Sequence, residues 1–157
     1  MTTNLLTCGE LGIPEAVTHA HDELRAALAR ATAEPGPVGA AAKHLAELCV
    51  PYFDKEEKDV FRVFGLLDDL LTDRARPDRA VALPVLAELR GLRDSARDRR
   101  HLIDAAIQEL LQRASEANNR NIAGVADALK RQEKVEDEVM YPAILLIDQS
   151  LRESLGG

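Results

Sequence analysis

EDEVMYP, residues 136–142, repeats the pattern of EEKDVF, residues 56–61: acidic residues, a short gap and then two apolar residues. Each segment lies in a long stretch whose apolar residues recur every three to four positions, which is the spacing of one face of an α-helix. The two segments therefore predict two long helices that share one design. In both helices a glutamate, Glu56 or Glu136, is expected on the apolar face.

Glycine, proline and asparagine residues divide the chain into an N-terminal arm and four helical stretches. We expect the arm at residues 1–13 and the helices near 14–32, 38–72, 84–115 and from 120 onward. Because the connections are short, neighbouring helices are expected to run antiparallel. The sequence thus predicts one all-α domain over residues 14–155, an up-down-up-down antiparallel four-helix bundle.

The composition of the 157 residues agrees with a helical, intracellular protein. Hydrophobic residues make up 46% but aromatic residues only 3%, which favours helices over a sheet. The net charge of −7 argues against nucleic acid or an anionic membrane surface as a partner. No apolar run approaches the roughly 18 residues of a membrane span, and the first residues lack a basic leader. With Cys8 and Cys49 as separate free thiols, we expect a cytoplasmic protein.

Helical spacing also predicts which side chains face the core. In the first helix His21 falls among apolar residues, whereas His19 points away. The apolar faces expected for the first and second helices contain Val17, Ala20, Leu24, Leu28 and Ala31, and Leu45, Cys49, Val63 and Leu67. Glu56 lies near the centre of the second face, with Tyr52 one turn before it. His44 is expected at the edge of that face.

The third and fourth helices add further polar residues to the predicted core. Their expected apolar faces contain Leu89, Leu92, Ala96, Ile103, Ile107 and Leu110, and Val125, Leu129, Val139, Ala143 and Ile147. Gln132 and Glu136 interrupt the fourth face, and Tyr141 is expected opposite it. On the third helix Arg100 flanks the core and His101 lies on the far side. Buried Glu56 and Glu136 need a metal ion, a cationic side chain or a shared proton.

These residues resemble the hemerythrin-like family of HHE cation-binding domains. Its pattern is a histidine on the first helix, His-x-x-x-Glu on the second, a histidine on the third and His-x-x-x-Glu on the fourth. The likeness covers the chain beyond residue 13: His21, Glu56 and Glu136 match family ligands. Tyr52 and Gln132 stand where histidines would be, and the third helix offers Arg100 by position or His101 by residue type. The resemblance implies two irons bridged by carboxylates, with oxygen, peroxide or nitric oxide as ligands.

Two main hypotheses follow for the centre of the predicted bundle. In one, Arg100 bridges Glu56 and Glu136 in place of a metal, and the chain is a binding or regulatory protein. In the alternative, His21, Tyr52, Glu56, Gln132 and Glu136 hold non-haem iron, mononuclear or dinuclear, that binds or senses a small diatomic ligand or peroxide. An enzymatic role would depend on this second hypothesis.

A third reading is a plain helical bundle whose likeness to the family is accidental. Under any of these readings, long helices leave outer faces that suit a homodimer or another protein partner. The sequence contains no heptad pattern sharp enough to identify such a face.

Overall fold

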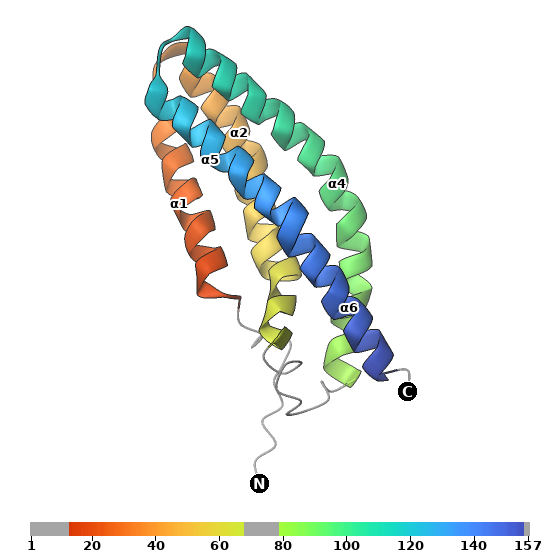
Figure 1. Ribbon diagram of the computed structural model, residues 1–157. Coiled ribbons are helices and arrows are strands. Elements are labelled where there is room, and N and C mark those ends of the chain that lie inside the picture. Colours follow the sequence, from red (N-terminus) through yellow and green to blue (C-terminus); the bar gives the residue numbers. More distant parts are fainter. Residues whose placement is uncertain (1–12, 68–78, 156–157) are drawn as a thin grey trace.

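A computed structural model describes residues 13–67 and 79–155, and within these ranges all the regular structure is helical (Figure 1). The α-helices are α1 (Glu15–Ala31), α2 (Gly36–Lys55), α4 (Arg79–Glu116), α5 (Arg120–Val135) and α6 (Tyr141–Leu155). A π-helical turn, η1 (Glu56–Val60), and a 3-10 helix, η2 (Phe61–Leu66), continue α2. A second π-helical turn, η3 (Glu136–Met140), joins α5 to α6. The prediction of an all-α protein is confirmed.

The helices lie lengthwise beside one another (Figure 1). The connections from α1 to α2 and from α4 to α5 are at the same end of the molecule, and α5, η3 and α6 form one long rod. α2 packs against α1 and α4, while α5 packs against α4 and α1. The four helical rods are α1, α2 with η1 and η2, α4, and α5 with η3 and α6. Their side chains meet along a shared interior.

Two turns explain where the helices stop. Gly39, near the start of α2, lies so close to the connection from α1 that a Cβ there would sit 1.8 Å from the carbonyl oxygen of Glu34, so only glycine fits. At the other turn Asn118 has a φ of 52°, and the side chain of Asn119 accepts a hydrogen bond from the Ile122 amide at 3.2 Å. This cap begins α5 where the sequence predicted the fourth helix. The end predicted for the second helix, beyond residue 67, and the N-terminal arm up to residue 12 with Cys8 lie outside the described residues.

The core forms two clusters that meet near the middle of the rods. One cluster joins α1, α2, α4 and α5, and the other joins η1 and η2 to η3 and α6. The buried residues include most of those predicted for the first three helices: Leu24, Leu28, Ala31, Leu45, Cys49, Val63, Ala96, Ile103, Ile107 and Leu110. The side chains of Leu89 and Leu92 lie outside the described part of the chain.

Near the two π-helical turns the predicted faces are correct only in part, because Val63 and Ile147 are buried as expected but two other predicted residues are not. Val139 and Leu67 were expected in the core, yet they are 60% and 37% exposed. A π turn closes hydrogen bonds to the fifth rather than the fourth preceding residue, so it inserts one residue and changes which of the neighbouring side chains face the core. Met140 and Ile144 are buried instead. The two repeated segments thus share a local structure: Glu56 and Glu136 each begin a five-residue π turn.

Over the residues that the structure describes, no helix combines the length and apolar character needed to cross a bilayer.

Candidate metal centre

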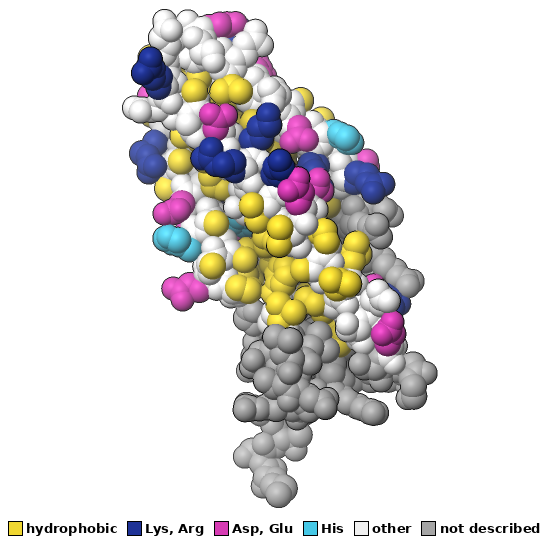
Figure 2. Space-filling view, in the orientation of Figure 1, with side chains coloured by type: hydrophobic (Ala, Val, Ile, Leu, Met, Phe, Trp, Pro, Cys, Tyr) yellow, Lys and Arg dark blue, Asp and Glu magenta, His cyan; other side chains and the backbone are white. Residues whose placement is uncertain are grey.

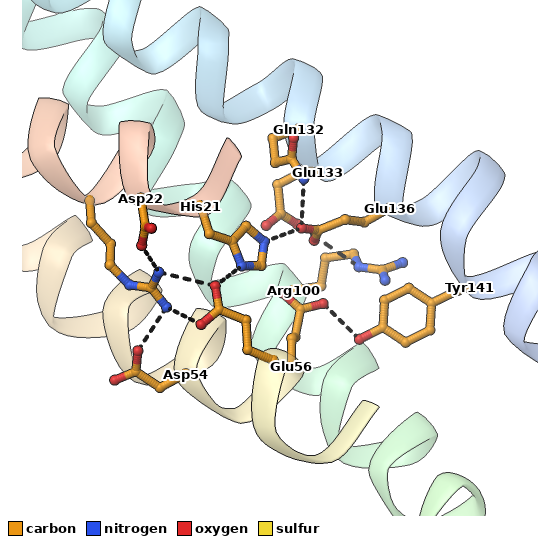
Figure 3. Close-up of polar contacts among 11 residues, drawn as sticks. His21, Asp22, Asp54, Glu56, Arg100, Gln132, Glu133, Glu136 and Tyr141 are labelled. Carbon is orange, nitrogen blue, oxygen red and sulfur yellow. Dashed lines mark hydrogen bonds and ion pairs between the residues drawn. The ribbon is translucent and has the colours of Figure 1, made fainter. Parts of the chain in front are cut away.

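Three potential metal ligands meet at the boundary between the two core clusters. They are His21 from α1, Glu56 at the start of η1 and Glu136 at the start of η3 (Figure 3). One ligand atom of each lies within 4.8 Å of one ligand atom of the other two, and the three side chains are buried. The sequence predicted that all three would face the core, and the structure brings them together.

The imidazole of His21 contacts a carboxylate on each side. Nε2 lies 2.9 Å from Oε1 of Glu136, and Nδ1 lies 3.0 Å from Oε1 of Glu57. The ring also stacks on Phe53, with 4.3 Å between ring centroids. Stacking on Phe53 and the two polar contacts therefore orient the ring.

Glu57 is itself held by Arg25, one turn after His21 on α1. The guanidinium donates to both carboxylate oxygens of Glu57, at 3.0 Å and 2.9 Å, in the bidentate geometry that makes arginine–carboxylate pairs strong. It also pairs with Asp22 and Asp54. These roles of Arg25 and Glu57 were not predicted from the sequence. A signal was present, because Arg25 follows His21 by four residues and Glu57 directly follows Glu56.

Gln132 and Tyr141 orient the two central carboxylates. Gln132 Nε2 donates to Oε1 of Glu136 at 3.0 Å, and the Tyr141 hydroxyl donates to Oε2 of Glu56 at 2.9 Å. Tyr141 was predicted to lie opposite the core face. That prediction is wrong because the η3 turn rotates Tyr141 inward, toward Glu56 (Figure 3).

Several buried oxygen atoms at the centre have no hydrogen-bond partner. They are Oε1 of Glu56, Oε2 of Glu136, Oε2 of Glu133 and the hydroxyl of Tyr52, all within the described part of the chain. A buried polar atom without a partner costs about 1–3 kcal/mol, and more if it is charged. These unpartnered oxygens, beside an oriented imidazole, form a donor set that fits a bound cation.

Glu133 is a third buried acidic residue, beside Glu56 and Glu136, and it was not predicted from the sequence. Burial, followed by the charge of Glu136, raises its pKa to about 8. The buried positions Ile122, Ala126, Leu129, Glu133, Glu136 and Met140 follow one another at spacings of four and three. A face drawn through that series, instead of through Val125 and Val139, would have found Glu133.

Burial also controls the protonation of the other central groups. It raises the pKa of Glu56 well above the usual range, and the charge of Glu136 adds to this effect. Burial and the charge of Glu56 raise the pKa of Tyr52, so without a metal ion its hydroxyl is neutral at physiological pH. The metal-free centre thus holds protons that a bound cation could displace.

Arg100 does not form the expected bridge. Its ion pairs within the described chain are with Asp137 and, at 4.0 Å, with Glu133, not with Glu56 and Glu136. Its guanidinium also lies 5.1 Å from the centroid of the Tyr141 ring. The side chain is 21% exposed, so it flanks the centre, as the helical spacing predicted, without entering it.

The remaining histidines lie away from the centre. His101 and His44 are exposed, and His19, whose side chain is 71% exposed, pairs with Glu23. His21 is therefore the one histidine that the structure brings to the candidate centre.

Comparison of the chain with protein-family models, curated proteins and solved structures finds no match.

Proposed function

We propose that the protein is a hemerythrin-like, up-down-up-down four-helix bundle that binds iron through His21, Glu56 and Glu136. The observation that carries this proposal is the convergence of three buried donors, from three helical rods, within 4.8 Å of one another. Burying an imidazole between carboxylates costs free energy that apolar side chains of similar volume would not cost. A bound cation compensates for this cost.

The contacts of His21 support the same conclusion. Arg25 donates to both carboxylate oxygens of Glu57, so Glu57 is oriented to accept the Nδ1 proton of His21, as the partners of metal-bound histidines commonly do. In the neutral ring, Nε2 then directs a lone pair at Oε1 of Glu136, 2.9 Å away. Two lone pairs at that distance repel each other. A cation is therefore needed between them, either a proton or a metal ion.

The donor types are compatible with iron. One imidazole nitrogen with carboxylate oxygens suits iron, manganese and zinc, while thiolates would favour copper, zinc or an iron–sulfur cluster. The thiol of Cys49 is buried nearby, but burial raises its pKa, so it is not a ready ligand. The three-donor set supports one ion. Tyr52 would add a phenolate donor if ferric iron displaced the proton of its hydroxyl, whose pKa is also raised by burial.

In this proposal the protein binds or senses oxygen, nitric oxide or peroxide. Iron held by His21, Glu56 and Glu136 would supply the redox-active centre at which such a ligand binds. The side chains provide the surroundings: Gln132 and Tyr141 orient the carboxylates, and the Tyr52 hydroxyl remains available to bind or to donate. Phe53 and Phe61, which are 1% and 0% exposed, keep water away from the imidazole.

A metal-free regulatory protein is the second candidate. It is favoured by the two contacts of His21, since a doubly protonated imidazole would satisfy both Glu57 and Glu136 without a metal. Its function would then lie on the outer surface. Figure 2 shows hydrophobic side chains gathered on the face formed by η3 and α6, where Val139 and Leu146 are 60% and 65% exposed. Such a face suits a second copy of the chain or another protein.

Metal content separates the two candidates. The protein is expressed in iron-supplemented cells and analysed by plasma mass spectrometry, together with His21→Ala and the control His19→Ala. We expect about one iron per chain in the wild type and in His19→Ala, and its loss in His21→Ala with the helical content retained. A folded wild type that binds neither iron nor manganese nor zinc would contradict the proposal and favour the metal-free candidate.

A further inference from the structure

Large apolar side chains on the surface concentrate on one helical rod. Six such side chains are exposed among the residues that the structure describes, and four of them lie on the rod formed by α5, η3 and α6. They are Val135, Val139, Leu145 and Leu146. Single exposed apolar residues are normal in proteins, whereas a contiguous group of them marks an interaction surface.

Val135, Val139 and Leu146 form an apolar stripe along this rod. Val139 follows Val135 by four residues and Leu146 follows Val139 by seven, which are the spacings of one helix face. Each of the three directly precedes a buried residue in the sequence, so the stripe is rotated from the core face by roughly 100°. The stripe therefore faces solvent beside the core and cannot be buried within one copy of the chain.

The charges of the same rod change sign along its length. Outside the buried core, α5 has four cations and one anion, a net charge of +3: Arg120, Lys130, Arg131 and Lys134, with Asp127. There η3 and α6 have four anions and one cation, a net charge of −3: Asp137, Glu138, Asp148 and Glu153, with Arg152. Figure 2 shows Lys and Arg side chains over α5 and the apolar patch below them. The apolar stripe thus begins where the basic half of the rod meets the acidic half.

This pattern makes the rod complementary to a reversed copy of itself. In an antiparallel pair the basic α5 of each copy lies against the acidic η3 and α6 of the other, whereas a parallel pair places like charges opposite each other. A two-fold dimer uses the same patch on both copies, so the patch must contain both halves of its own complement. The rod meets this condition, which favours a second copy over an unrelated protein.

We propose that the protein forms a two-fold dimer in which the α5–η3–α6 rods of two copies pack antiparallel. The two-fold axis lies within about one helical turn of Val139, so the apolar stripes of the two copies bury each other. The basic and acidic halves pair on either side of the axis. This inference goes beyond the proposed metal centre and does not depend on it, because every residue involved lies on the outer face of the rod.

Sedimentation equilibrium of the metal-free protein tests the dimer. We expect the wild type to dimerise at tens of micromolar protein, and Val139→Glu/Leu146→Glu to weaken the dimer at least about tenfold with the helical content retained, because carboxylates would be buried in an apolar contact. Leu102→Glu is the matched control, since Leu102 is 58% exposed but lies on α4, and it should dimerise like the wild type. If the double variant fails to fold, Val139→Ser/Leu146→Ser should also weaken the dimer.

A charge swap tests the pairing of the two halves. Arg131 and Glu153 are exposed and lie on opposite sides of the proposed axis. Arg131→Glu should weaken the dimer several-fold because it places two anions together, and Arg131→Glu/Glu153→Arg should restore it. A double variant no better than the single one would contradict antiparallel pairing.

Cross-linking tests the orientation. In a Cys8→Ser background the remaining native thiol, that of Cys49, is buried. With a short bismaleimide, Val139→Cys should then give a covalent dimer. Asn121→Cys, at an exposed position near the start of α5, should not, because antiparallel copies hold these two residues roughly 50 Å apart at 1.5 Å per residue. A parallel pair would cross-link at both positions.

Three results would overturn the proposal: a wild type that stays monomeric at hundreds of micromolar, a dimer that Leu102→Glu weakens as much as Val139→Glu/Leu146→Glu, or equal cross-linking at positions 121 and 139. Metal content separates this failure from failure of the proposed function. A protein that dimerises through the stripe but binds no metal loses only the metal centre. A monomer that binds iron through His21 loses only the dimer.

Discussion

Nδ1 of His21 lies 3.0 Å from Oε1 of Glu57, so the histidine of α1 is oriented by the residue that directly follows Glu56. One π turn therefore supplies both a candidate ligand and the group that orients another. Because Glu57 is held by Arg25 from the same helix as His21, the orientation depends on a closed set of contacts between α1 and η1.

Glu57→Gln is expected to weaken iron binding without removing a ligand. The amide keeps the size of the side chain but loses the charge that favours a proton on Nδ1, and comparable changes cost roughly 10–100-fold in metal affinity. Affinity is measured by competition with a chelator. Glu47→Gln, at an exposed position on α2, is the matched control and should bind like the wild type. Equal affinities for Glu57→Gln and the wild type would show that Glu57 does not support the site.

The buried carboxyl of Glu133 should make the metal-free protein less stable as the pH rises. Its pKa is about 8 in the folded chain against an ordinary value of 4.5, so between these values the folded state binds more protons than the unfolded state. The free energy of unfolding then falls with increasing pH, by at most about 5 kcal/mol over the window. The contribution is complete below about pH 4.5 and lost above about pH 8.

Glu133→Gln isolates this effect, because the amide does not titrate. Urea unfolding between pH 4.5 and 8 should give a smaller loss of stability for the variant than for the wild type. Glu109→Gln, at an exposed position on α4, should keep the wild-type slope. Parallel curves for the wild type and Glu133→Gln would mean that this carboxyl ionises normally in the folded protein.

The two tyrosines should respond differently to loss of their hydroxyl groups. Tyr141→Phe removes the hydrogen bond to Glu56 and should cost about 1–3 kcal/mol in the metal-free protein, because a buried acceptor is left unpaired. Tyr52→Phe removes a hydroxyl that has no partner, so the free energy of unfolding should stay the same or rise. Urea unfolding of the two variants checks this, and the opposite order of stabilities would contradict the contacts described here.

Periodicity was sufficient to predict the helical fold class and much of the core. The turn at Asn118 and Asn119 could be predicted because their side chains and backbone preferences act locally. His21, Glu56 and Glu136 could be found because each lies where the regular helical spacing still holds. His21 lies within α1, and Glu56 and Glu136 are the first residues of the π turns.

The errors begin where the helices stop being regular. Beyond Glu136 the assumed rotation of 100° per residue is wrong, so Val139 was placed inside and Tyr141 outside. The two repeated acidic segments mark the places of the π turns, but helical spacing alone does not distinguish a π turn from an α-helical one. The prediction of a bridge by Arg100 was wrong for a different reason. The position of Arg100 on the helix was predicted correctly. Its partners, Glu133 and Asp137, depend on distances between helices, which the spacing of residues along one helix does not give.

The most direct test of the central claim is an anomalous diffraction measurement at the iron absorption edge, on crystals of protein loaded with ferrous iron. We predict a peak about 2 Å from Nε2 of His21 that also contacts the carboxylates of Glu56 and Glu136. The absence of a peak there, with Nε2 of His21 still in contact with Oε1 of Glu136 in protein supplied with iron, would contradict the metal centre.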